Sequence, residues 1–109
     1  GIYMAGTPSK LFKYIAGEDR VHYLQKLPGS ATFDLKNGPP GMLIGGTYNR
    51  NEAFEYNIET GELTNLGRVH PEEMYVYSVA YDEEQDDYYF GLGSRAHVIR
   101  YDRTTGEKT

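Results

Sequence analysis

The chain contains a pattern of short segments that occurs three times and limits the folds it can adopt. In each copy a strand-like stretch ends in Gly followed by Thr or Ser, and a second strand-like stretch follows after a short loop. The first stretches are 1–7 (GIYMAGT), 41–47 (GMLIGGT) and 88–94 (YYFGLGS), and the second are 10–16, 52–57 and 97–102. An internal repeat of this kind makes one supersecondary unit the building block of the whole fold.

The spacing of the repeat selects among repeat architectures. Gly6, Gly46 and Gly93 occupy equivalent positions, at intervals of 40 residues (6 to 46) and 47 residues (46 to 93). Units of about 40 to 50 residues are typical of propeller blades, each a four-stranded antiparallel sheet, whereas ankyrin and TPR units are shorter and helical. No stretch shows a sustained apolar period of about 3.6 residues, as an amphipathic helix would. The pattern therefore predicts an all-β fold made of β-propeller blades.

The chain has room for further strands between the repeated segments. In residues 75–82 (YVYSVAYD) the smaller side chains occupy alternate positions, so they lie on one face of the expected strand. This pattern is typical of a strand packed closely on a neighbouring sheet. Strands are named A to D from the propeller axis outward. The prediction is one partial propeller domain over 1–109, with strands B to D in 1–27, a full blade in 31–67, and strands A to C with the start of D in 75–109. This amounts to about two and a half blades of an incomplete ring.

Two outer turns carry the same motif, Y-N-I-E-T-G-E at 56–62 and Y-D-R-T-T-G-E at 101–107. The motif resembles the outer hairpin of quinoprotein-like and kelch-like β-propellers, which include dehydrogenases, polysaccharide lyases, sugar-binding modules and protein scaffolds. Propellers have four to eight blades, so we expect the remaining blades to come from the same longer chain or from other copies. The chain departs from quinoprotein repeats in having no Trp, which argues against a quinone cofactor.

Composition excludes several classes of function. The chain is 39% apolar, and no apolar run approaches the roughly 18 residues of a membrane span. A net charge of −5 argues against a nucleic-acid partner, because phosphate binding requires basic surface. Without cysteine there is no disulfide, thiolate metal site or cysteine nucleophile. The compartment is left open by these features, with secretion or the periplasm favoured.

In the propellers that the motif resembles, loops joining strands D to A and B to C gather at one mouth of the channel, where ligands bind. The resemblance implies a binding site there for a carbohydrate or acidic polysaccharide. The ligand-binding residues we expect are Tyr48, Asn49, Arg50, Glu72, Tyr77 and Arg95, and the catalytic candidates are His70, His97 and Tyr75. Tyrosine faces suit sugar rings and arginine suits carboxylates. A histidine base with a tyrosine acid suits β-elimination, so the chain is a candidate part of a polysaccharide lyase.

Each of these candidates also has a simpler interpretation. His70 and the following Pro-Glu-Glu can form a solvated turn, and His97 can simply start a strand. The three histidines lack metal-ligand spacing, so no metal site is predicted. The acidic run 82–87 leaves calcium as the one cofactor to consider, although it lacks the glycine and final glutamate of a calcium loop. The alternative to carbohydrate binding is a protein-interaction or structural propeller without catalysis, and whether the chain is an enzyme stays open.

Overall fold

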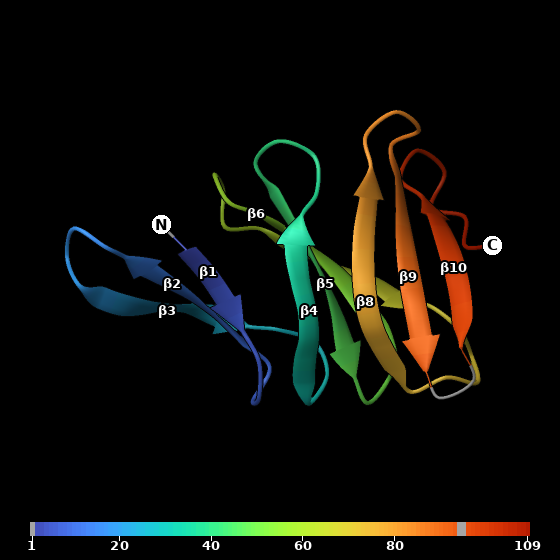
Figure 1. The fold of residues 1–109 in the computed structure, drawn as a ribbon, viewed down its shortest axis with the longest axis horizontal. Helices are drawn as coiled ribbons and strands as arrows, with labels where there is room; N and C mark the ends of the chain where they lie inside the picture. The colour runs from blue at the N-terminus through green and yellow to red at the C-terminus, as the bar shows by residue number, and fades with distance from the viewer. Residues whose placement is uncertain (1, 94–95) are drawn as a thin grey trace.

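The computed structural model describes residues 2–93 and 96–109, and these residues form an all-β molecule (Figure 1). The prediction of an all-β chain is confirmed. Ten strands follow one another along the described residues: β1 (Ile2–Ala5), β2 (Lys10–Ile15), β3 (Arg20–Lys26), β4 (Ala31–Asn37), β5 (Met42–Tyr48), β6 (Glu52–Asn57), β7 (Leu63–Arg68), β8 (Tyr75–Asp82), β9 (Asp87–Gly93) and β10 (His97–Asp102).

The strands are organised as three antiparallel meanders. Strands β1 to β3 form the first meander, β4 to β7 the second, and β8 to β10 the third. An isolated bridge between Tyr101 and Lys108 extends the third meander beyond β10. The second and third meanders are in register contact at a single residue pair, Tyr48 with Tyr75. Contacts that involve side chains, and not a continuous hydrogen-bond ladder, therefore hold these two meanders together.

The repeated Thr-Gly-Glu turns are built by the same hydrogen bonds. The Asn57 side-chain oxygen accepts the peptide N–H groups of the second and third residues after it, at 2.9 and 3.1 Å, and Asp102 does the same at 2.8 and 3.2 Å. Gly61 and Gly106 follow with φ of 76° and 78°, a conformation that glycine adopts without steric cost. The motif thus encodes a hairpin turn, and its recurrence reflects a structural requirement.

Strands β5 and β6 of the second meander contribute to two cores, one on each face. On one face Leu43 and Phe54 pack with Leu11 and Leu27 of the first meander. On the opposite face, apolar residues of the second and third meanders form a larger core, which comprises Ile44, Ala53, Val69, Val76, Val79, Tyr88, Phe90 and Leu92. Successive residues of β5 and β6 point to opposite faces, so each of these strands contributes to both cores.

A charged network joins the outer parts of the second and third meanders. The Tyr88 hydroxyl donates to Glu55 Oε2 at 2.5 Å, and Arg103 Nε donates to the same oxygen at 2.8 Å. Arg103 Nη1 also donates to Asp86 Oδ1 at 3.0 Å. Burial, reinforced by the hydrogen bond to Glu55, raises the pKa of Tyr88 far above its usual value. Tyr88 therefore keeps its proton and acts as a permanent donor to Glu55.

Replacing Tyr88 with Phe removes this donor while keeping the buried ring. Hydrogen bonds to charged groups contribute about 1.5–3 kcal/mol, and we expect Tyr88→Phe to lower the free energy of unfolding by about that amount. Urea denaturation measures the loss. The matched control is Tyr89→Phe on the same strand, at a side chain that is 37% exposed. Equal stability of the two variants would contradict the structural role of the Tyr88–Glu55 bond.

The same network makes stability depend on pH in the acid range. The Tyr81 hydroxyl, which donates to Asp86 at 2.8 Å, and Arg103 together lower the pKa of Asp86 below its ordinary value. The folded state therefore favours the carboxylate, and this contribution is present above the unfolded-state pKa of about 4 and is lost as the pH falls below it. We expect the melting temperature of Asp86→Asn to fall less steeply below pH 4 than that of the wild type. Parallel profiles would refute the assignment.

Candidate functional site

One edge of the molecule collects loops from all three meanders. The connections β1–β2, β3–β4, β5–β6 and β7–β8 lie along the lower edge in Figure 1, which we call the loop edge. Equivalent backbone hydrogen bonds order it in two meanders: Leu27 N–H donates to the Ser9 carbonyl, and Val69 N–H to the Asn51 carbonyl, each at 2.8 Å. The loop edge is therefore an ordered surface built from segments that are far apart in the sequence.

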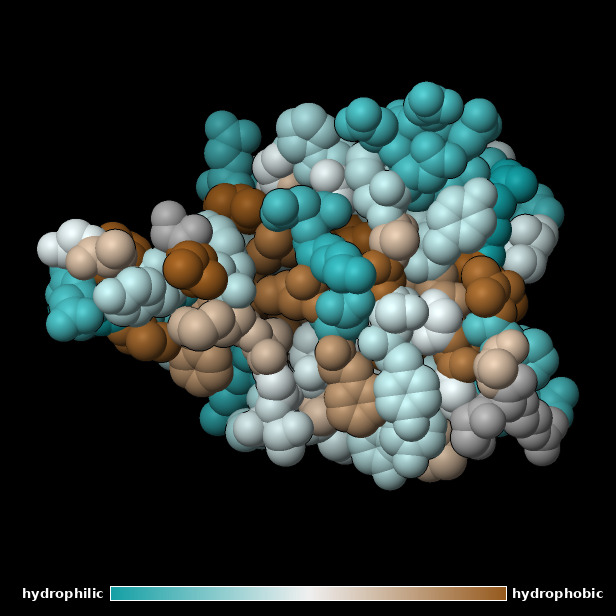
Figure 2. Space-filling view, viewed as in Figure 1, coloured by the Kyte–Doolittle hydropathy of each residue, from teal (hydrophilic) through white to brown (hydrophobic). Residues whose placement is uncertain are grey.

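Four aromatic rings stack together close to this edge, and we call them the aromatic cluster. Phe33 lies 5.5 Å from Tyr77 at an interplanar angle of 6°, and Tyr75 lies 5.0 Å from Tyr77 at 5°. Tyr48 completes the cluster at 4.7 Å from Tyr75. Phe33 is 41% exposed and Tyr77 is 53% exposed. In Figure 2 tan and pale ring-shaped side chains are grouped at the lower edge of the face that β4 and β8 present. The cluster thus offers nearly parallel ring faces to solvent.

Two β-bulges at equivalent positions aim the exposed rings. In the β4–β5 ladder Thr32 and Asp34 are paired and Phe33 is left out. In the β8–β9 ladder Val76 and Ser78 are paired and Tyr77 is left out. A bulge of this kind inserts one residue into a strand and redirects its side chain. The same irregularity in both meanders therefore brings Phe33 and Tyr77 together on the exposed face.

The ring of Tyr77 lies directly over Gly93 of the neighbouring strand. A Cβ atom added at Gly93 would overlap the Tyr77 ring, so the position requires glycine for the ring to lie flat there. Glycine in this strand thus serves the geometry of the aromatic cluster.

Changing Gly93 to Ala should displace the Tyr77 ring without removing any aromatic group. We expect weaker near-ultraviolet circular dichroism from the stacked tyrosines, while the far-ultraviolet spectrum keeps its β-sheet form. Gly6→Ala is the matched control, because a Cβ atom there meets nothing within 4 Å. An unchanged near-ultraviolet spectrum for Gly93→Ala would show that the ring does not depend on this glycine.

A second cluster of polar side chains lies between β7 and the start of β10. His97 Nδ1 is 2.8 Å from Oε2 of Glu73, whose side chain is almost fully buried. The His70 ring stacks on His97 at 4.4 Å and 21°, and His70 Nδ1 accepts the peptide N–H of Glu72 at 3.1 Å. Arg68 donates to the carbonyl oxygens of His70 and Glu73, both at 3.2 Å, and thereby orders the loop. We call His70, Glu73 and His97 the histidine cluster.

The structure brings most of the predicted residues into these two clusters. Tyr48, Tyr75 and Tyr77 belong to the aromatic cluster, and His70 and His97 stack on each other. Glu72 contributes a backbone N–H to His70. Asn49 and Arg50 are exposed in the β5–β6 loop, and Arg95 lies outside the described residues.

Tyr75 keeps the proton that an acid or a hydrogen-bond donor needs. Interaction with the neighbouring Tyr48 hydroxyl, and then burial, raise the pKa of Tyr75 above its usual value. Tyr75 is consequently a donor at neutral pH and not a phenolate base.

Sequence reasoning missed Phe33 and Glu73. Phe33 occupies the place in its meander that Tyr77 occupies in the next, but this equivalence rests on the bulges in the two strand pairs, which the sequence alone does not show. Glu73 is the second of two adjacent glutamates, and only its burial distinguishes it from Glu72.

The structure also bears on metals and membranes. Among residues 2–93 and 96–109, no three His, Cys, Asp or Glu side chains are grouped so as to hold a metal ion. The acidic run 82–87 includes the β8–β9 turn, in which Asp82 Oδ1 accepts the peptide N–H of Glu84 at 3.0 Å. Within the same described residues, no helix has the length and apolar character to cross a bilayer.

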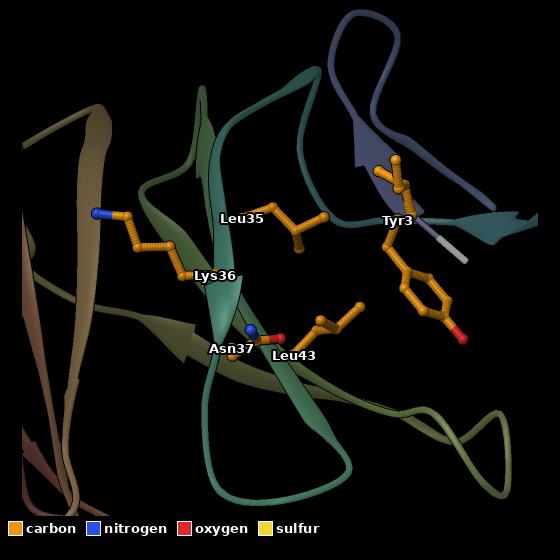
Figure 3. A pocket seen from close by; sticks show the side chains of 6 residues that line it. Tyr3, Leu35, Lys36, Asn37 and Leu43 are labelled. Atoms are coloured by element: carbon orange, nitrogen blue, oxygen red, sulfur yellow. The ribbon is translucent and has the colours of Figure 1, made fainter. Parts of the chain in front are cut away.

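A hollow of about 300 Å³ lies away from the loop edge, between β1 and the β4–β5 hairpin. Apolar side chains, among them Tyr3, Leu35 and Leu43, and the polar Lys36 and Asn37 line it (Figure 3). The ammonium group of Lys36 lies 3.4 Å from Asp34 Oδ2. Its six described lining residues include no histidine, aspartate or glutamate.

No protein-family model and no curated protein matches the chain. The function is accordingly argued from the aromatic cluster and the histidine cluster.

Proposed function

We propose that the chain is an arc of a β-propeller, similar to quinoprotein-like and kelch-like propellers, and that it binds a carbohydrate at the loop edge. Support for the propeller comes from the repeat interval, the three meanders, the shared turn chemistry and the equivalent bulges in β4 and β8. Under this proposal β4 and β8 are the innermost strands, and the aromatic cluster faces the mouth of the channel.

The aromatic cluster is the observation that carries the binding proposal. Monomeric proteins rarely leave several large rings exposed together, and such patches commonly mark binding sites. Phe33 and Tyr77 present ring faces, while the tyrosines add hydroxyl groups that can donate and accept hydrogen bonds. A sugar ring has apolar C–H faces and a rim of hydroxyls, so its two kinds of surface match the two kinds offered here.

The histidine cluster supports catalysis as a second candidate function. A polysaccharide lyase needs a base to remove a proton and an acid to protonate the leaving oxygen. His97, held through Nδ1 by Glu73, has its Nε2 for the first task, and Tyr75 keeps a proton for the second. Cleavage would apply to uronic-acid polymers, whose carboxyl group makes the neighbouring C–H acidic.

Removing the exposed rings tests the binding proposal. We expect Phe33→Ala and Tyr77→Ala each to weaken binding to neutral polysaccharides about tenfold or more, because each variant loses a buried aromatic contact with the ligand. Affinity electrophoresis in gels containing xylan, mannan or soluble β-glucan measures the loss. Tyr23→Ala is the matched control, since Tyr23 is 56% exposed on β3, away from the aromatic cluster.

Two outcomes would count against the proposal. Absence of binding by the wild type, or equal binding by all variants, would favour a protein-interaction or structural propeller instead. A parallel incubation with polygalacturonate, monitored by the absorbance of unsaturated products, separates binding from cleavage. An increase in absorbance that His97→Ala abolishes supports the lyase function. No increase means that the protein binds carbohydrate without cleaving it.

A further inference from the structure

We propose that the stacked pair of His70 and His97 is a donor–acceptor site for two adjacent hydroxyl groups on a sugar ring. This inference rests on the proposed carbohydrate binding and narrows its ligand class: sugars with a free vicinal diol are favoured over uronic acids recognised through their carboxylates. It follows from which nitrogen atom carries the proton in each ring.

The hydrogen bond to His70 fixes its tautomer. The peptide N–H of Glu72 donates to His70 Nδ1 at 3.1 Å. A ring nitrogen that accepts a hydrogen bond carries no proton, so the proton of the neutral imidazole is on Nε2. His70 therefore presents an N–H donor at its outer nitrogen.

The opposite tautomer is fixed at His97. The carboxylate form of Glu73 only accepts hydrogen bonds, and beside it the 2.8 Å contact with Oε2 places a proton on His97 Nδ1. In the singly protonated ring, Nε2 then carries a lone pair and is an acceptor. Glu73 is 1% exposed, which holds its carboxylate in place. Glu73 is thus a positioning residue that sets both the orientation and the tautomer of His97.

The ring that offers a donor, His70, stacks on the ring that offers an acceptor, His97. The ring centroids are 4.4 Å apart, and the planes differ by 21°. In the part of the chain that the structure describes, the hydrogen bonds of both rings run through Nδ1. The His97 side chain is 41% exposed, so a ligand can approach its outer edge. A ligand that contacts one ring of the stacked pair therefore lies next to the other ring.

This combination fits hydroxyl groups better than a carboxylate. A hydroxyl both donates and accepts, so one of two adjacent hydroxyls can accept from His70 while the other donates to His97. A carboxylate only accepts, so the lone pair on His97 Nε2 would oppose it. Arg68 does not reverse this preference, because its guanidinium donates to backbone carbonyls of the same loop. The net charge of −5 adds a general repulsion of anionic polymers.

The aromatic and histidine clusters are continuous along the chain. Glu73 precedes Tyr75 by two residues, and Tyr75 pairs with Gly93 at the end of the strand that leads to His97. Both clusters are therefore built around the β7–β8 loop and the start of β8.

Calorimetry with defined hexasaccharides tests the inference. The probes are β-1,4-linked hexamers of xylose, mannose and glucose, the α-1,4-linked hexamer of galacturonic acid, and a 2,3-di-O-methylated form of the tightest neutral binder. We expect the wild type to bind a neutral hexamer more tightly than the galacturonate. Methylation removes the hydroxyl protons and should weaken binding about 5- to 10-fold, the effect of one lost hydrogen bond.

The variants assign this preference to the histidine pair. We expect His70→Phe, which keeps a stacked ring, and Glu73→Gln, which no longer fixes the His97 tautomer, to bind the free neutral hexamer about 5- to 10-fold more weakly. Both should bind the free and methylated forms almost equally, which a purely structural role would not produce. His22→Phe is the matched control, because His22 contacts Glu18 near the β2–β3 turn, away from the histidine cluster. Thermal melting checks folding, and if Glu73→Gln does not fold, His70→Phe decides.

The outcomes separate the two proposals. Binding that is lost in Phe33→Ala and Tyr77→Ala, but keeps its methylation effect in His70→Phe, would overturn the histidine inference and leave carbohydrate binding intact. Tighter binding of the galacturonate hexamer would also overturn it. No binding of any hexamer by the wild type would overturn the carbohydrate proposal and this inference together.

Discussion

The fit of β5 between two layers of side chains is the constraint on which the rest of the structure depends. Gly45 lies against the ring of Phe54, and Gly46 lies against Val76 of the next meander, so closely that a Cβ atom at either position would overlap its neighbour. Larger residues would push Phe54 into the first core or separate β5 from β8. Gly46 thus sets the distance between the second and third meanders, and Gly45 makes room for the Phe54 ring, which belongs to the core shared with the first meander.

The structural repeat and the chemistry of the site depend on different parts of the sequence. Turns and cores recur because each meander must close its hairpins and bury its faces, and Asn57 and Asp102 meet the first need in the same way. The histidine cluster arises where the third meander differs from the others, in the segment that leads to β8 and at the start of β10. Function on a repeated fold is commonly carried by such unrepeated loop residues.

Sequence reasoning reached the all-β class because alternation and turn chemistry are local properties, visible in segments such as 75–82 and 56–62. It placed Tyr48, Tyr75 and Tyr77 near one mouth of the predicted propeller, and in the structure their rings stack on one another. It could not find the role of Glu73, because burial of one of two adjacent carboxylates depends on packing between distant strands. Phe33 was missed because a bulge is a property of the pairing of two strands, and not of either strand alone.

The aromatic cluster takes Phe33 and Tyr48 from the second meander and Tyr75 and Tyr77 from the third, across a joint with one backbone register pair. A ligand that touches rings from both sides would therefore act as a clamp on that joint. By thermodynamic linkage, its binding free energy would add to the docking of the two meanders. Conversely, any change that loosens the packing of the two meanders would lower the affinity for the ligand, even if no residue that contacts the ligand is altered.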